Sequence, residues 1–253
     1  MTPSSSLQYN QQLHIIAISL VIILSALHFV IIQADFDGKD LFVNLALIAS
    51  ISATLFTLAV IFKRYDGARN IRTAYLYLFI SYVAYLQGEI TWFGYESILG
   101  IYPYPSIADI GFFFYYVFTT IFLISIVRCH TKLTRYDVGH AMIIISIITS
   151  VYMVLNIEAE VEQYDLVYAL PFILASSSVF AFSITAVMKL RKTSIALPWI
   201  IIFVSMLITT IADIWYYNLE NLGAYTYDHV INTLWITSDA VLIYALILHR
   251  RIL

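Results

Sequence analysis

One stretch of the sequence decides the fold of the rest, residues 89–116, EITWFGYESILGIYPYPSIADIGFFFYY. This stretch holds Glu89, Glu96 and Asp109, together with Trp92 and several tyrosines, inside an otherwise very apolar sequence. A carboxylate in an apolar helix is costly unless it faces protein or water. The stretch therefore predicts two membrane helices and their connecting loop, with acidic side chains turned toward the protein interior.

The composition of the whole chain indicates a membrane protein. Of its 253 residues, 61% are hydrophobic and 11% are charged, and the mean hydropathy is +0.86. A soluble domain carries about 25% charged residues. Eight apolar segments have roughly the 20 residues that a bilayer-spanning helix needs. We thus expect an all-α, polytopic protein with eight transmembrane helices, at about 13–33, 41–62, 73–95, 106–128, 138–156, 164–188, 196–217 and 228–248.

The positions of the charges support this number of helices. If each segment crosses the membrane once, twelve of the 13 basic residues lie on one side, and only Lys39 lies on the other. The positive-inside rule makes that side cytoplasmic. Of the 16 acidic residues only Asp66 and Asp137 lie there. The expected location is the cell membrane, with both termini cytoplasmic. The twelve basic residues are Lys63, Arg64, Arg69, Arg72, Arg128, Lys132, Arg135, Lys189, Arg191, Lys192, Arg250 and Arg251.

A second copy of the opening stretch occurs at residues 213–239, DIWYYNLENLGAYTYDHVINTLWITSD. A shift of 124 residues aligns the helix that carries Glu89 with the one that carries Asp213, and a shift of 123 aligns the helices that follow. The pattern predicts tandem duplication of a four-helix unit, with repeats at 1–135 and 136–253, and a pseudo-two-fold axis along the membrane normal. The aligned pairs include Glu89 with Asp213, Glu96 with Glu220, Asp109 with Asn232, and Tyr116 with Asp239.

The acidic residues of both copies predict a polar cavity that opens to the outer face. Asp239 lies near the middle of the last segment, where an ionisable group is a candidate proton carrier or ligand contact. Alternatively, these groups serve only as hydrogen-bonded links between helices, and Ser106 to Asp109 has the form of a helix capping box. The candidate ligand-binding residues are Glu89, Trp92, Asp109, Tyr116, Asp213, Trp215 and Asp239.

Aromatic residues gather at the outer ends of the same segments. The ordinary explanation is the aromatic belt of membrane proteins, but aromatic rings beside carboxylates also suit a cationic organic ligand. No spacing of histidine and cysteine residues suggests a zinc or haem site, and no lysine suggests retinal. We therefore expect no metal and no cofactor, and the partner that the composition implies is the lipid bilayer, not a nucleic acid.

The motif Pro103-Tyr104-Pro105-Ser106-Ile107-Ala108-Asp109 resembles a turn in membrane-embedded input regions of prokaryotic signalling proteins. The resemblance covers about 30 residues. In those proteins a PYPSxAD-like turn leads into a helix, ahead of a diguanylate cyclase or kinase domain. The resemblance implies a sensor, and because no output domain is expected in this chain, a signalling partner in the membrane or cytoplasm.

Three functions follow as hypotheses. The first is a membrane sensor or ligand-binding protein with an acidic and aromatic cavity. The second is a small secondary transporter coupled to protons or cations, with Glu89, Asp213 and Asp239 as its ion sites. The third is a membrane enzyme that acts on lipid through its carboxylates, although the sequence holds no recognisable nucleophile or metal-binding pattern. The sequence leaves the ligand and the oligomeric state open.

Overall fold

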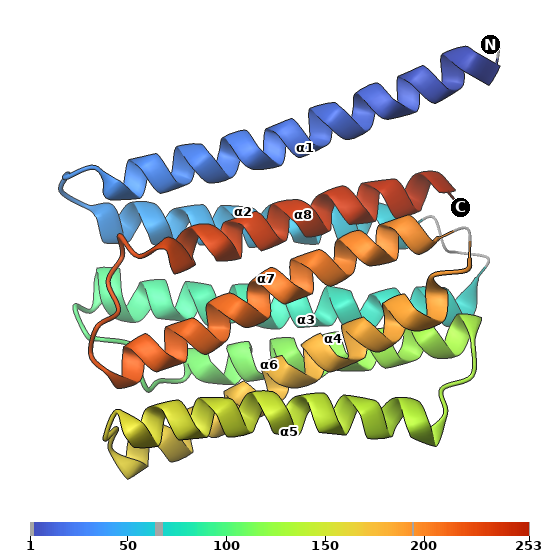
Figure 1. Cartoon of the computed structure of the whole chain (residues 1–253). Helices are drawn as coiled ribbons and strands as arrows, with labels where there is room; N and C mark the ends of the chain where they lie inside the picture. The colour runs from blue at the N-terminus through green and yellow to red at the C-terminus, as the bar shows by residue number, and fades with distance from the viewer. Residues whose placement is uncertain (1–2, 64–67, 194, 253) are drawn as a thin grey trace.

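The computed structural model describes residues 3–63, 68–193 and 195–252, and these residues form helices and connecting loops without a β-strand. The all-α, eight-helix prediction is confirmed. The α-helices run up and down in sequence, so that successive connections alternate between the two ends of the bundle (Figure 1). They are α1 (Pro3–Gln33), α2 (Lys39–Phe62), α3 (Arg69–Phe93), α4 (Ala108–His130), α5 (Arg135–Glu158), α6 (Gln163–Leu190), α7 (Ala196–Asn221) and α8 (Val230–Ile252), with a π-helical turn, η2 (Gly94–Ile98), extending α3.

Seven of these helices are long and apolar enough to cross a membrane, and the exception is α3. Helix α3 has 25 residues, which is long enough, but it carries Tyr75, Tyr82, Gln87 and Glu89 along its length. Three of these four side chains, those of Tyr75, Tyr82 and Glu89, are buried inside the protein. Its lower hydropathy thus reflects polar groups that face neighbouring helices, as the sequence predicted for Glu89.

Six helices close a ring in the order α2, α3, α4, α6, α7, α8, with each helix packed against the next and α8 packed back against α2. Helices α1 and α5 lie outside this ring, α1 against α8 and α5 chiefly against α6, as Figure 1 also shows. Large apolar side chains on their outer faces are exposed, for example Ile15 at 65% and Ile147 at 58%. Such faces suit contact with lipid.

The two ends of the bundle differ in charge. The basic end carries the α2–α3, α4–α5 and α6–α7 connections, with Lys63, Lys132 and Arg191 among its residues. The acidic end carries the other four connections, with Glu96, Glu158 and Glu220 among its residues. Helix α1 starts and helix α8 finishes at the basic end (Figure 1). Arg64 and Asp66, which we assigned to the basic end, lie outside the described residues, as do the side chains of Arg250 and Arg251.

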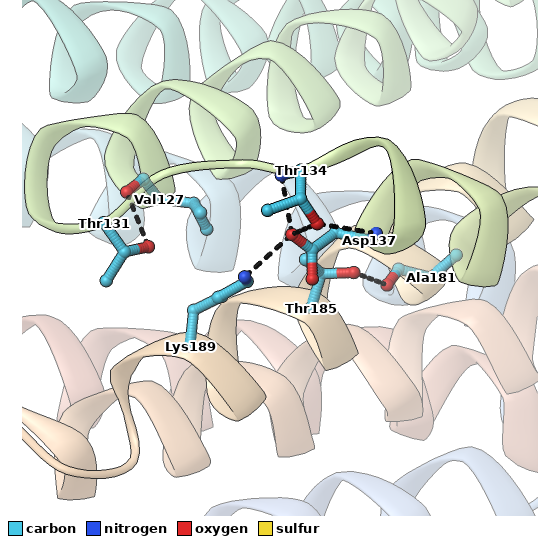
Figure 2. A network of polar contacts seen from close by, with 7 residues as sticks. All are labelled: Val127, Thr131, Thr134, Asp137, Ala181, Thr185 and Lys189. Atoms are coloured by element: carbon cyan, nitrogen blue, oxygen red, sulfur yellow. Dashed lines mark hydrogen bonds and ion pairs between the residues drawn. The ribbon is translucent and has the colours of Figure 1, made fainter.

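The basic end is fixed by a cap and an ion pair, which Figure 2 shows. At the start of α5 the Asp137 carboxylate accepts hydrogen bonds from the backbone N–H and the hydroxyl of Thr134, both at 2.7 Å. The Lys189 ammonium of α6 lies 2.8 Å from the same carboxylate. One acid thus both caps α5 and joins it to α6.

Helices α3 and α4 approach each other most closely at two glycines, Gly88 and Gly111. A Cβ atom at Gly111 would lie 2.6 Å from the carbonyl oxygen of Ala84 and 2.7 Å from the backbone nitrogen of Gly88. Only glycine permits backbones to approach so closely. The contact sets the distance between the helices that carry Glu89 and Asp109, each of which is within two residues of a contacting glycine.

Candidate functional site

A pocket lies inside the ring, toward its acidic end, and encloses about 660 Å³ of empty space including the part open to solvent. Its lining comes from α2, α3, α4, α7 and α8 and from the α7–α8 loop. The residues are Asn44, Leu47, Tyr85, Glu89, Trp92, Asp109, Phe112, Tyr115, Tyr116, Thr209, Asp213, Tyr216, Tyr217, Tyr225, Tyr227 and Trp235.

The pocket wall is aromatic and acidic. Ten of its residues are Tyr, Trp or Phe, three are Asp or Glu, and among the described residues that line it there is no Lys, Arg or His. The rings contact one another closely, with centroids 4.7 Å apart for Tyr85 and Tyr115 and 5.4 Å apart for Tyr216 and Trp235. Such a wall attracts cations and repels anions, because carboxylates and the faces of aromatic rings both carry negative potential.

Asp213 is held firmly by its neighbours. It is 3% exposed, and each of its oxygens accepts a hydrogen bond, from the Ser176 hydroxyl of α6 at 2.7 Å and from the Trp235 indole N–H of α8 at 3.0 Å. The Tyr116 hydroxyl of α4 is a further neighbour. This carboxylate therefore links four helices of the ring, which fits the structural alternative that the sequence left open.

Glu89 differs from Asp213 in having no hydrogen-bond or ion-pair partner among the residues that the structure describes. It is 7% exposed and lines the pocket. No hydrogen bond or ion pair within the described part of the chain reaches its carboxylate, and the charges that act on it most, Asp239 and Glu96, are acidic. A buried charge of this kind is very unfavourable unless it is neutralised or paired. Glu89 is thus the one pocket acid that is prepared to meet a ligand or to hold a proton.

Asp109 lies at the start of α4 and lines the pocket with 5% of its surface exposed. Its carboxylate accepts a hydrogen bond of 2.7 Å from the backbone N–H of Ser106, as the predicted capping box requires. The Ser106 hydroxyl, however, accepts from the N–H of Ala108 at 3.1 Å and not from that of Asp109. Asp109 also accepts a hydrogen bond of 2.7 Å from the Tyr168 hydroxyl, so it joins α4 to α6.

Asp239 lies outside the pocket lining, although the sequence placed it among the ligand contacts. It is 3% exposed and accepts hydrogen bonds from the Ser50 hydroxyl of α2 at 2.7 Å and from the Tyr82 hydroxyl of α3 at 3.0 Å. The ring of Tyr82 packs edge-on against pocket residue Tyr115, with centroids 5.5 Å apart. Asp239 therefore bonds two side chains that also lie outside the pocket lining.

Trp215 also lies outside the lining. Its side chain is 40% exposed and packs edge-on against the His229 ring, with centroids 4.8 Å apart. Of the seven predicted ligand-binding residues, five line the pocket and two do not.

Several residues that line the pocket were not among the predicted ligand contacts, including Asn44, Tyr85, Phe112 and Trp235. The spacing of residues along a helix could have identified two of them. Tyr85 precedes Glu89 by one turn and Trp235 precedes Asp239 by one turn, so each shares a helix face with an acid that we had singled out.

Two loops at the acidic end of the bundle are each tied to the other half of the chain. Tyr102 of the α3–α4 loop donates a hydrogen bond to Glu220 at the end of α7. Tyr227 of the α7–α8 loop donates to Glu96 in η2, whose other oxygen accepts from Asn44 at 2.7 Å. Burial, together with the carboxylate partners, raises the pKa of both tyrosines above the ordinary value, so they remain neutral donors.

The chain matches no protein-family model, and neither a curated protein nor a solved structure is detectably similar to it. The likeness of residues 103–109 to signalling input regions thus stays a prediction. Within the described residues there is also no group of three or more His, Cys, Asp and Glu side chains that could hold a metal ion.

Proposed function

We propose that this multi-pass membrane protein binds a small ligand from the outer side of the cell membrane and acts as a sensor or ligand-binding protein. The observation that carries the proposal is the pocket at the acidic end, where no described residue bonds the buried Glu89 carboxylate. The positive-inside rule supports the outward direction, because the basic residues lie at the opposite end. Both termini are then cytoplasmic.

The proposal includes a duplicated architecture. In the predicted repeat α2 corresponds to α6, α3 to α7 and α4 to α8. If each helix of the ring is replaced by its counterpart, the order of neighbours around the ring stays the same, which supports an internal repeat. Helices α1 and α5 do not follow this relation, since α1 packs on α8 whereas α5 packs chiefly on α6. The pocket lies between the two halves, so a ligand would contact both and shift one against the other. A signalling partner in the membrane or cytoplasm would respond to that shift.

A thiol-accessibility experiment tests whether the pocket is open to the outside. Leu47 lines the pocket, whereas Ala49 of the same helix is exposed on its outer face. Leu47→Cys and Ala49→Cys are each made in a Cys129→Ser background, which removes the native cysteine. In intact cells a membrane-impermeant thiol reagent should label Leu47→Cys much faster than Ala49→Cys. Equal rates, or no labelling of Leu47→Cys, would contradict an outward-facing pocket.

A secondary transporter is the second candidate, and one observation favours it. A series of buried polar side chains leads from the pocket toward the basic end. It starts at Thr209, whose hydroxyl lies 2.5 Å from that of Ser238, and the Ser238 hydroxyl lies 3.0 Å from that of Ser205. With Asp239 beside them, these groups could relay a proton or a cation. Saturable binding without uptake into proteoliposomes supports the sensor, whereas proton-coupled uptake supports the transporter.

A further inference from the structure

The acids around the pocket differ in whether their charge is already compensated. Asp213 and Asp109 each accept two hydrogen bonds, and Asp239 beyond the wall accepts two more. Within the described residues Glu89 accepts none, although it is more than nine-tenths buried. A ligand that brings one positive charge would compensate Glu89 without displacing any bond that the other acids make.

The wall around Glu89 is made of aromatic rings. Tyr85 lies one turn before it on α3 and Trp92 one turn after it, and both line the pocket. Phe112 of α4 lies between them, with ring centroids 5.9 Å from Tyr85 and 6.2 Å from Trp92. A cation within about 6 Å of a ring centroid is attracted to the ring face, and more strongly where water is excluded.

The alignment of the two halves identifies one of the donors that Asp213 has and Glu89 lacks among the described residues. The shift of 123 residues matches Phe112 with Trp235, whose indole N–H bonds Asp213. The first half thus has a phenyl ring where the second has a donor. The acid in the first half lacks this donor, and a ring without a hydrogen-bonding group lines the same pocket.

A bare metal ion fits this arrangement poorly. Calcium takes 6–8 oxygen ligands, and magnesium prefers six, whereas the other pocket acids already hold donors and apolar rings occupy the space around Glu89. An anion would meet a wall without a basic residue. We propose that the pocket binds a small organic monocation, an ammonium group on an apolar body, with its charge against Glu89 and its body against Tyr85, Trp92 and Phe112. The inference rests on the proposed function, because it names the ligand class of the same pocket.

Binding of defined probes to the purified full chain tests this ligand class. The probes are benzyltrimethylammonium, 2-phenylethylammonium, neutral 2-phenylethanol and anionic phenylacetate, measured by isothermal titration calorimetry in nanodiscs. The two cations should bind saturably, and the neutral and anionic probes at least about tenfold more weakly, a difference of about 1.4 kcal/mol. Glu89→Gln should weaken cation binding at least about tenfold and leave 2-phenylethanol binding nearly unchanged.

The matched control is Glu158→Gln, which removes the same charge from an exposed position at the acidic end, outside the pocket lining. It should leave all affinities unchanged. Cation binding that survives Glu89→Gln, or absence of cation binding up to about 10 mM, overturns the proposal. If a neutral or anionic probe binds instead and Trp92→Leu abolishes that binding, the ligand class is wrong and the binding function stands. If the Leu47→Cys experiment shows no outward access, the binding function itself fails.

Discussion

Replacing Gly111 with alanine should separate α3 from α4 and destabilise the fold. The new Cβ atom would lie 2.6 Å from the Ala84 carbonyl oxygen and 2.7 Å from the Gly88 nitrogen. Both are backbone atoms, which cannot turn aside as a flexible side chain can. Ordinary contact begins near 3.4 Å, so α4 has to move by about 0.8 Å, the difference between 3.4 and 2.6 Å. Overpacking of this kind costs about 1–3 kcal/mol.

Gly139→Ala is the matched control, because Gly139 lies in α5 and a Cβ atom there meets nothing within 4 Å. This change should stabilise the helix by up to about 1 kcal/mol. The assay is equilibrium unfolding in mixed micelles with a rising fraction of dodecyl sulfate, followed by tryptophan fluorescence. Gly111→Ala should unfold at a clearly lower fraction than wild type, and Gly139→Ala at an equal or higher one. If both variants unfold at the same fraction of dodecyl sulfate, α3 and α4 do not pack as closely as described.

Three further predictions concern the buried acids and the loop above them. Asp213→Asn should lower the free energy of unfolding by about 1–3 kcal/mol, because the amide nitrogen cannot accept one of the two buried hydrogen bonds that Asp213 accepts. Glu89→Gln removes a buried carboxylate that no described residue bonds and should not lower it; equal losses in the same micelle assay would mean that Glu89 has a partner. Asp239→Asn should destabilise the protein as Asp213→Asn does. If the protein is a transporter, this change should also abolish proton-coupled uptake, and uptake that persists would show that Asp239 does not carry the proton. Tyr227→Phe loses the hydroxyl that bonds Glu96, and it should speed ligand exchange several-fold in stopped-flow fluorescence; an unchanged rate would show that this loop does not limit entry.

Hydropathy was sufficient to place the helices because lipid-facing segments differ so strongly from the loops. The predicted 41–62 corresponds to Lys39–Phe62, and the predicted 138–156 corresponds to Arg135–Glu158. The largest difference is at the start, where α1 begins at Pro3 and not near residue 13. The added turns contain Ser and Gln residues, which extend a helix without making it more apolar.

The site was only partly predictable. Helical spacing and the repeat predicted that Glu89 and Asp213 approach one cavity, and both line the same pocket. Which of them is paired depends on Ser176 and Trp235, which lie on α6 and α8. Contacts between distant segments of this kind do not show in local patterns. For the same reason Asp239 was expected in the cavity, although it lies outside the pocket lining and bonds Ser50 and Tyr82.

The position of a bound cation is the most direct test of whether Glu89 binds the ligand. A structure of the protein with an iodinated benzyltrimethylammonium, located by the anomalous signal of its iodine, would give that position. We predict that the ammonium lies within about 6 Å of the Trp92 ring centroid and next to the Glu89 carboxylate. A cation found beside Asp213 or Asp109, or only on the lipid-facing surface, would contradict it.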